Sequence, residues 1–146
     1  MQTQSSEQNL EKLNDCLRSE RSAVETYTLA IKHTDKPEVT TTLSDIRESH
    51  SLRTKRIADF LRAHGVEPVK SAGAWGAIAK AVQSGANLFG DKAAVASLEE
   101  FEDRFLKMYK DDEWYPSDVQ QFISSELLPR QQRTHELCRE LKRFIA

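Results

Sequence analysis

Residues 13–27, LNDCLRSERSAVETY, place a glutamate where the helical repeat requires an apolar side chain. Leu13, Leu17 and Tyr27 recur at the three- and four-residue steps of one buried helix face, with Ala23 or Val24 between them. Glu20 falls on the same stripe. A carboxylate that faces a core costs several kcal/mol unless it is paired, protonated or bound to a metal. The sequence therefore predicts a partner for this carboxylate elsewhere in the chain.

The composition predicts one all-helical, soluble domain over residues 1–146. Hydrophobic residues make up 38% of the chain and charged residues 30%, and there are only five Gly and four Pro. A chain of this length forms a single core without a second domain. The net charge of −2 gives no long-range attraction to nucleic acid or to an anionic membrane, so we expect neither as a partner.

From the N-terminal sequence, the lack of a membrane-spanning segment and the cysteines we expect a cytoplasmic protein. The N-terminus, MQTQSSEQNLEKLNDC, has no apolar run behind a basic start and does not resemble a secretory signal. No segment has the length and apolarity of a membrane span. Cys16 and Cys138 lack Cys-x-x-Cys spacing, so we expect reduced, semi-buried thiols.

Four helices are predicted, and no strand. The first begins near Ser5 or Ser6 and ends near Thr34, and Pro37 starts the second, which Gly65 closes. A long crossover with a short helix follows, from Gly65 to about Asp91. The third helix runs from Asp91 or Lys92 to as far as Trp114, and the fourth covers about 117–145, bent at Pro129. The pattern predicts an up-down four-helix bundle with one crossover, in which the second and third helices run parallel.

Each of the later helices also carries an inward stripe with a polar residue on it. In the second helix the stripe includes Ile46, His50 and Ile57, and in the third it includes Leu98, Glu102, Phe105 and Tyr109. In the fourth helix the predicted inward residues are Phe122 or Ile123, Leu127, Gln131, His135, Cys138 and Leu141.

Equal distance from the turn places residues of an antiparallel hairpin at the same height. The midpoint of Glu20 and His50 is Asp35, within the first turn, and that of Glu102 and His135 lies just past the second turn. The four side chains should therefore meet at mid-height. Two carboxylates and two imidazoles suit a divalent ion such as iron, manganese or zinc. The alternative is a set of buried ion pairs without metal.

The chain resembles the ferritin-like superfamily, especially bacterioferritins and rubrerythrins. The spacing Glu20-x-x-Ala23-x-x-x-Tyr27 resembles the first helix of that superfamily, His50 and His135 match the histidines of its two Glu-x-x-His motifs, and Glu102 matches its lone third-helix glutamate. Ser-Ala-Gly-Ala-Trp-Gly at 71–76 resembles a bacterial group of small rubrerythrin-like bundles of unknown function. The resemblance implies a link to stress physiology. We also expect a homo-oligomer, with a dimer favoured.

Two departures from the family pattern weaken a di-iron interpretation. Arg47 and Gln132 stand three residues before His50 and His135, where di-iron members carry the glutamates that bridge the metals. The Arg47 guanidinium is a candidate to replace the metal charge beside the carboxylates, with Gln132 and Tyr27 as further neighbours of the centre. A single metal ion, a metal-free network, and occasional binding of either kind all remain open, and we favour the metal-free or degenerate state.

Two functions from different classes follow. The first is a non-enzymatic or weakly metal-binding bacterial bundle that acts as a homo-oligomer or a partner-binding module. The second is a rubrerythrin-like, metal-dependent oxidoreductase with a reduced metal centre at Glu20, His50, Glu102 and His135. Ser-His-Asp sets, Gly-rich phosphate loops and paired Cys sites are not visible in the sequence, so it supports neither a hydrolase nor a nucleotide-binding protein.

Overall fold

A computed structural model of the chain describes residues 2–72, 91–110 and 114–145. Within these ranges all regular secondary structure is helical, as predicted. Three long helices are followed by a composite fourth one. The helices are α1 (Gln2–Lys32), α2 (Pro37–Ala63), α4 (Asp91–Lys110) and the continuous series α5 (Asp118–Phe122), η1 (Ile123–Leu127) and α6 (Leu128–Ile145).

The bounds of α1 and α2 follow from local chemistry. α1 begins a few residues before the predicted serines and ends two residues before Thr34. Pro37 is the first residue of α2, where its missing N–H is not needed. Gly65, at φ 75°, ends α2 in the left-handed region that favours glycine. Its N–H donates to Arg62 O and the Val66 N–H donates to Leu61 O at 2.9 Å, the two bonds of a Schellman motif.

The fourth helix contains an irregularity that the sequence prediction placed at Pro129. Ser117 caps its start by accepting a hydrogen bond from the Gln120 N–H. A π-helical turn precedes Pro129, and the Leu128 N–H donates to Ile123 O, five residues back. A π turn holds one more residue than an α-helical turn. The buried residues Val119, Ile123, Leu127 and Gln131, each four apart, therefore stay on one face.

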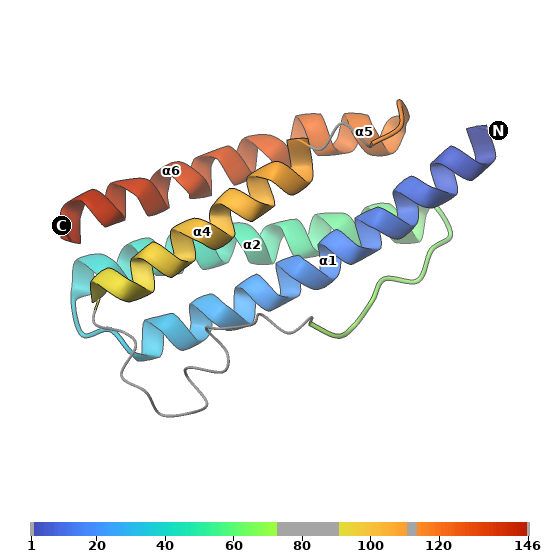
Figure 1. Ribbon diagram of the computed structural model, residues 1–146. Helices are drawn as coiled ribbons and strands as arrows, with labels where there is room; N and C mark the ends of the chain where they lie inside the picture. Colours follow the sequence, from blue (N-terminus) through green and yellow to red (C-terminus); the bar gives the residue numbers. More distant parts are fainter. Residues whose placement is uncertain (1, 73–90, 111–113, 146) are drawn as a thin grey trace.

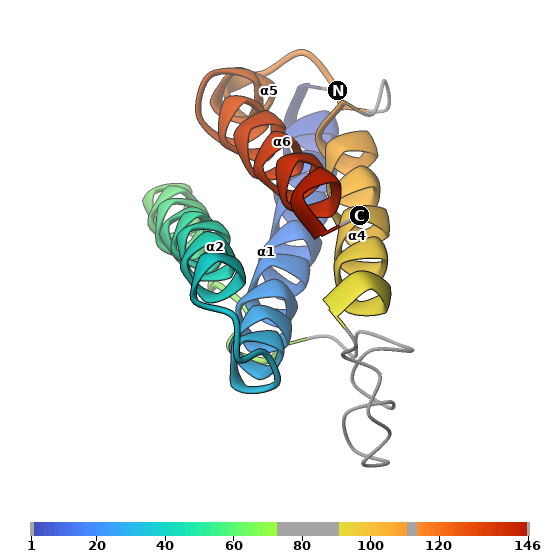
Figure 2. The ribbon, with the colours of Figure 1, turned by 90° about the vertical axis from the view of Figure 1, so that its left-hand side faces the viewer.

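The long helices surround a common interior (Figures 1 and 2). α1 packs against α2, α4 against α6, α2 against α6, and α1 against α5. Figure 1 shows that α2 and α4 run in one direction while α1 and α6 run in the other, in agreement with the predicted parallel pair.

The start of the crossover lies along α1. Asn14 accepts a hydrogen bond from the Val69 N–H at 2.9 Å and donates to Glu67 O at 3.2 Å. The Arg21 side chain donates to Val69 O at 2.9 Å. The short helix expected in the crossover falls on residues 73–90, outside the described residues.

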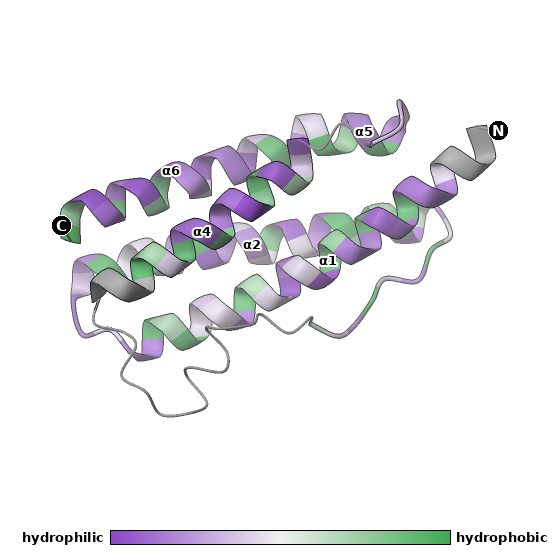
Figure 3. Cartoon of the chain, viewed as in Figure 1, coloured by the Kyte–Doolittle hydropathy of each residue, from purple (hydrophilic) through white to green (hydrophobic). Residues whose placement is uncertain are grey.

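The core consists of the inward faces of these amphipathic helices. Each helix contributes leucines or isoleucines that are fully or almost fully buried: Leu13 and Leu17 of α1, Leu43, Ile46, Ile57 and Leu61 of α2, Leu98 of α4 and Leu141 of α6. In Figure 3 hydrophobic and hydrophilic segments alternate along the ribbons. The two cysteines are buried and not bridged. In the part of the chain that the structure describes, no helix combines the length and apolarity that a membrane crossing requires.

Candidate buried ionic site

His50 lies between two carboxylates in the middle of the bundle. Its Nδ1 is hydrogen-bonded to Glu20 Oε1, and its Nε2 lies 2.9 Å from Glu102 Oε2. All three side chains have no solvent exposure. The imidazole thus joins α1, α2 and α4 through one ring, which confirms that Glu20 faces His50.

Arg53, three residues after His50, supplies a second buried cation. Its Nη1 lies 3.4 Å from Glu20 Oε2, and the whole side chain is inaccessible to solvent. The same guanidinium donates to Gln131 Oε1 and, at 3.1 Å, to Thr134 Oγ1. An arginine is almost never fully buried unless it is paired, and here carboxylate, amide and hydroxyl oxygens surround it.

Gln131 connects the arginine to the second carboxylate. Its amide nitrogen donates to Glu102 O at 2.9 Å and lies 3.4 Å from Glu102 Oε1, while its oxygen accepts from Arg53. Thr134 accepts from Arg53 and donates to Gln131 O at 3.2 Å. α6 therefore contributes neutral groups that satisfy the charged ones.

Two tyrosines complete the site. The Tyr109 hydroxyl donates to Glu20 Oε2 at 2.6 Å. The Tyr27 ring stacks on His50 with ring centroids 5.4 Å apart, and its buried hydroxyl has no hydrogen-bond partner among the described residues. Burial, reinforced by the nearby carboxylates, raises the pKa of both tyrosines well above 10.0, so both remain protonated. We call the eight side chains the ionic network; each helix contributes two of them, Glu20 and Tyr27, His50 and Arg53, Glu102 and Tyr109, and Gln131 and Thr134.

The charges of the ionic network balance. Burial and the Arg53 charge lower the pKa of His50, but Glu102 and Glu20 outweigh them, and its pKa is raised above 6.5. Burial raises the pKa of Glu102, but the charge and hydrogen bond of His50 outweigh burial and lower it below 4.5. Both ring nitrogens of His50 are hydrogen-bonded to carboxylate oxygens, and only a protonated imidazole has two N–H donors. An imidazolium and a guanidinium then face two carboxylates. Such a buried set avoids an uncompensated charge, which would be strongly destabilising in the core.

This arrangement does not fit a divalent ion. A metal ligand needs a free lone pair on an imidazole nitrogen, and both nitrogens of His50 are occupied by hydrogen bonds to carboxylates. The Arg53 guanidinium already lies beside Glu20, so an added ion of charge +2 would face a fixed cation. In the described ranges 2–72, 91–110 and 114–145, no group of three or more His, Cys, Asp or Glu side chains is arranged to hold a metal ion.

Three of the four predicted ligand residues come together, and His135 does not. The His135 ring is hydrogen-bonded to Asp103 near the surface, where the Asp103 side chain is 50% exposed. The expected meeting of His135 with Glu102 is therefore wrong, because Gln131, one turn earlier, occupies that position. On α6 the inward stripe continues through Thr134 rather than His135.

The two family departures also lie away from the site. Arg47 is half-buried and donates to Thr28 Oγ1 at 3.4 Å, so the guanidinium among the carboxylates is that of Arg53. Gln132 is exposed. Tyr27 does lie beside the centre, as expected.

One signal in the sequence could have identified Arg53. The predicted stripe of α2 passes from His50 to Ile57, a gap of seven residues that leaves one turn without an inward residue. Position 53 fills this gap at the three-residue step. The lack of an apolar residue at position 53 was thus itself an indication that the charged side chain of Arg53 is buried.

Over the described residues, fold and site define a helical protein with a charge-balanced ionic network in its core. The chain belongs to the DUF2383 family, described as a domain of unknown function, whose model matches residues 8–112. The match includes Glu20, His50, Arg53 and Glu102 and ends before the α6 residues of the site. The comparisons with curated proteins and with solved structures find no match.

Proposed function

We propose that this protein is a non-enzymatic bundle of the ferritin-like type in which a fixed ionic network replaces a metal centre. The observation that carries the proposal is the position of Arg53, fully buried beside Glu20. A guanidinium and an imidazolium provide there the two positive charges that a divalent ion would otherwise supply. The two antiparallel hairpins, with α2 parallel to α4, and the carboxylates at mid-height support the ferritin-like relationship.

The ionic network holds the helices in register. A salt bridge in a core contributes little net stability compared with apolar packing, but removal of one partner is costly, and such groups favour one arrangement over others in some systems. With two side chains from each helix, the network penalises any slippage of one helix against the rest. We infer that the protein acts as a rigid scaffold or binding module, for which the resemblance to rubrerythrin-like bundles suggests stress physiology.

Metal analysis tests the proposal directly. Untagged protein is expressed in medium supplemented with iron, manganese or zinc, and bound metal is measured by mass spectrometry. We expect far less than one ion per chain, and no change of the melting temperature on addition of EDTA, since a ligand that binds only the folded state would stabilise it.

A designed variant provides the positive control for this experiment. Arg53→Gln combined with Gln131→Glu removes the fixed cation and adds a carboxylate, and zinc titration followed by calorimetry measures whether binding is gained. A stoichiometry near one ion per chain in the unmodified protein, lost on Glu20→Ala, overturns the proposal.

The second candidate is a metal-dependent oxidoreductase. The convergence of Glu20, His50 and Glu102 from three helices favours it, because these are suitable ligand types. It requires His50 to lose its proton and to turn one nitrogen away from a carboxylate. The metal stoichiometry in the preceding experiment distinguishes the two candidates.

A further inference from the structure

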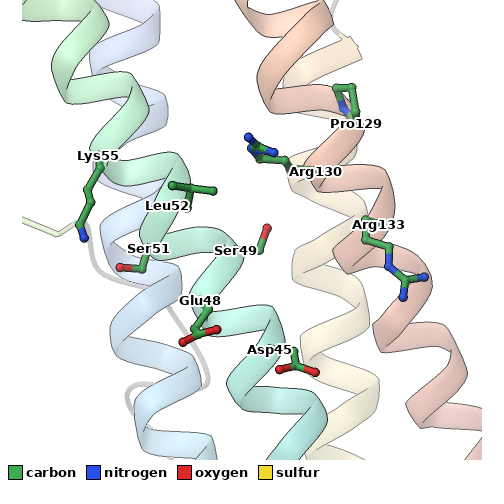
Figure 4. Close-up of a pocket in the computed structure, with 9 residues that line it drawn as sticks. All are labelled: Asp45, Glu48, Ser49, Ser51, Leu52, Lys55, Pro129, Arg130 and Arg133. Atoms are coloured by element: carbon green, nitrogen blue, oxygen red, sulfur yellow. The ribbon is translucent and has the colours of Figure 1, made fainter.

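A groove of about 700 Å³ opens between α2 and α6 on the outside of the bundle. Figure 4 shows Asp45 and Glu48 on its α2 side and Pro129, Arg130 and Arg133 on its α6 side. None of the eight side chains of the ionic network lines the groove, so the groove is a surface feature separate from that network. Neither the family match nor the proposed scaffold role assigns a function to it.

The two walls of the groove carry opposite charges that do not pair with each other. Asp45, Glu48 and Arg133 form no ion pair within 4.0 Å among the described side chains. Arg130 approaches Glu126 on its own helix at 3.5 Å, and its Nε is buried without a hydrogen-bond partner. Apart from Lys55, which lines one end of the α2 wall (Figure 4), the α2 edge is thus acidic and the α6 edge basic, and their charges are largely uncompensated.

We propose that this groove is the contact surface of a homodimer. A two-fold axis roughly parallel to the helices places the α2 edge of each copy over the α6 edge of the other. Asp45 and Glu48 of one copy then face Arg130 and Arg133 of the second copy, and the same contacts form twice. Such self-complementarity is the requirement of an isologous interface.

Charge complementarity favours a second copy over a different partner. A nucleic acid or an acidic peptide would meet the repulsion of Asp45 and Glu48, and a basic peptide that of the two arginines. Leu52, one of the few large hydrophobic side chains with substantial exposure, at 39%, lies within the groove. An apolar centre with charged residues around it is the usual composition of a protein interface.

A charge-swap experiment tests the interface. Asp45→Lys with Glu48→Lys makes both edges basic, and Arg130→Glu with Arg133→Glu makes both edges acidic. We expect the unmodified protein to sediment as a dimer, and each double variant to dissociate with a Kd raised roughly tenfold or more by like-charge repulsion. An equimolar mixture of the two variants should restore a dimer, because each basic edge then meets an acidic one.

Matched controls change the net charge equally outside the groove. Glu7→Lys with Glu11→Lys on α1, and Lys107→Glu with Lys110→Glu on α4, alter exposed residues and should leave the dimer intact. Circular dichroism verifies that the variants fold, and Leu52→Arg offers an independent disruption of the same surface. A monomeric unmodified protein, dimeric groove variants, or a mixture that stays monomeric overturns the proposal.

Discussion

His50 Nε2 and Glu102 Oε2 lie 2.9 Å apart in the core and connect two helices that the long crossover separates in sequence. α2 and α4 run in the same direction (Figure 1), so no short turn holds them together. The buried pair, with Glu20 on the opposite side of the ring, links the two helical hairpins chemically.

The stability contributed by His50 should decrease at alkaline pH. Its folded-state pKa is raised above 6.5 by Glu102 and Glu20, against burial and Arg53. A raised pKa stabilises the folded state fully below the unfolded pKa and loses this effect as the pH rises through the folded pKa. Urea unfolding at pH 5.5–9 should show the difference between the protein and His50→Phe shrinking with pH. His64, whose pKa is also raised, needs His64→Ala as the background.

Glu102 acts in the opposite pH range. Its pKa is lowered below 4.5 by His50, against burial, so its stabilising effect is present above the unfolded pKa and is lost as the pH falls through the folded one. Acid unfolding of Glu102→Gln should therefore have a shallower pH dependence than that of the unmodified protein. Equal slopes for the two would contradict the assignment of a charged Glu102.

Loss of the Arg53 charge should be among the most destabilising single changes. Arg53→Met leaves Glu20 with one cation fewer and Gln131 without its donor, and removal of one member of a buried ion pair costs roughly 3–5 kcal/mol. Arg56→Met, an exposed arginine on the same helix, is the matched control and should stay within about 0.5 kcal/mol. Chemical denaturation measures both, and similar values would show that Arg53 is not paired.

Gln131 and not His135 should be sensitive to truncation. Gln131→Ala removes the acceptor of Arg53 and a donor to Glu102, which should cost roughly 1–3 kcal/mol. His135→Ala breaks only a pair near the surface and should cost at most about 1 kcal/mol. Gln132→Ala, at an exposed neighbouring position, is the control. A larger loss of unfolding free energy for His135→Ala than for Gln131→Ala would indicate that His135, and not Gln131, belongs to the ionic network.

The π turn should be removable without loss of the fold. Deletion of Ser125 shortens the step between the buried residues Ile123 and Leu127 from four to three and leaves an ordinary helical stripe. Because Pro129 lacks an N–H and its ring clashes in a regular helix, the deletion is combined with Pro129→Ala. We expect a free energy of unfolding within about 1 kcal/mol of the original.

The control deletion lies further along the same helix. Removal of Arg139 shortens the step from Cys138 to Leu141, both buried, to two residues and rotates the end of α6 by roughly one hundred degrees. This variant should lose much of its stability in the same denaturation assay. If both deletions are equally harmful, the π turn is required for more than spacing.

Much of the fold was predictable because amphipathic spacing is a local property. The stripes through Leu13 and Leu17, through Ile46, and through Leu98 and Phe105 place these residues in the core as expected. The same spacing brought Glu20, His50 and Glu102 inward. The four-residue steps from Val119 to Gln131 even contain the signal of the π turn, since an α-helix would rotate such a stripe away from the core.

The identity of the remaining site residues could not be read in the same way. On α6, Thr134 and His135 both lie within helical steps of Gln131 and Cys138, so spacing alone does not choose between them. The contact of α6 with α2 decides it, because Thr134 then meets Arg53 at 3.1 Å while His135 turns toward Asp103.

By itself the sequence determined four helices, most of their inward residues and the burial of Glu20, His50 and Glu102, because hydrophobic periodicity acts within each helix. Only the tertiary structure decided which cation neutralises Glu20 and which α6 residues complete the site. Those outcomes depend on how neighbouring helices are rotated and offset, and a buried charge takes its partner from whichever facing helix presents one within hydrogen-bond distance.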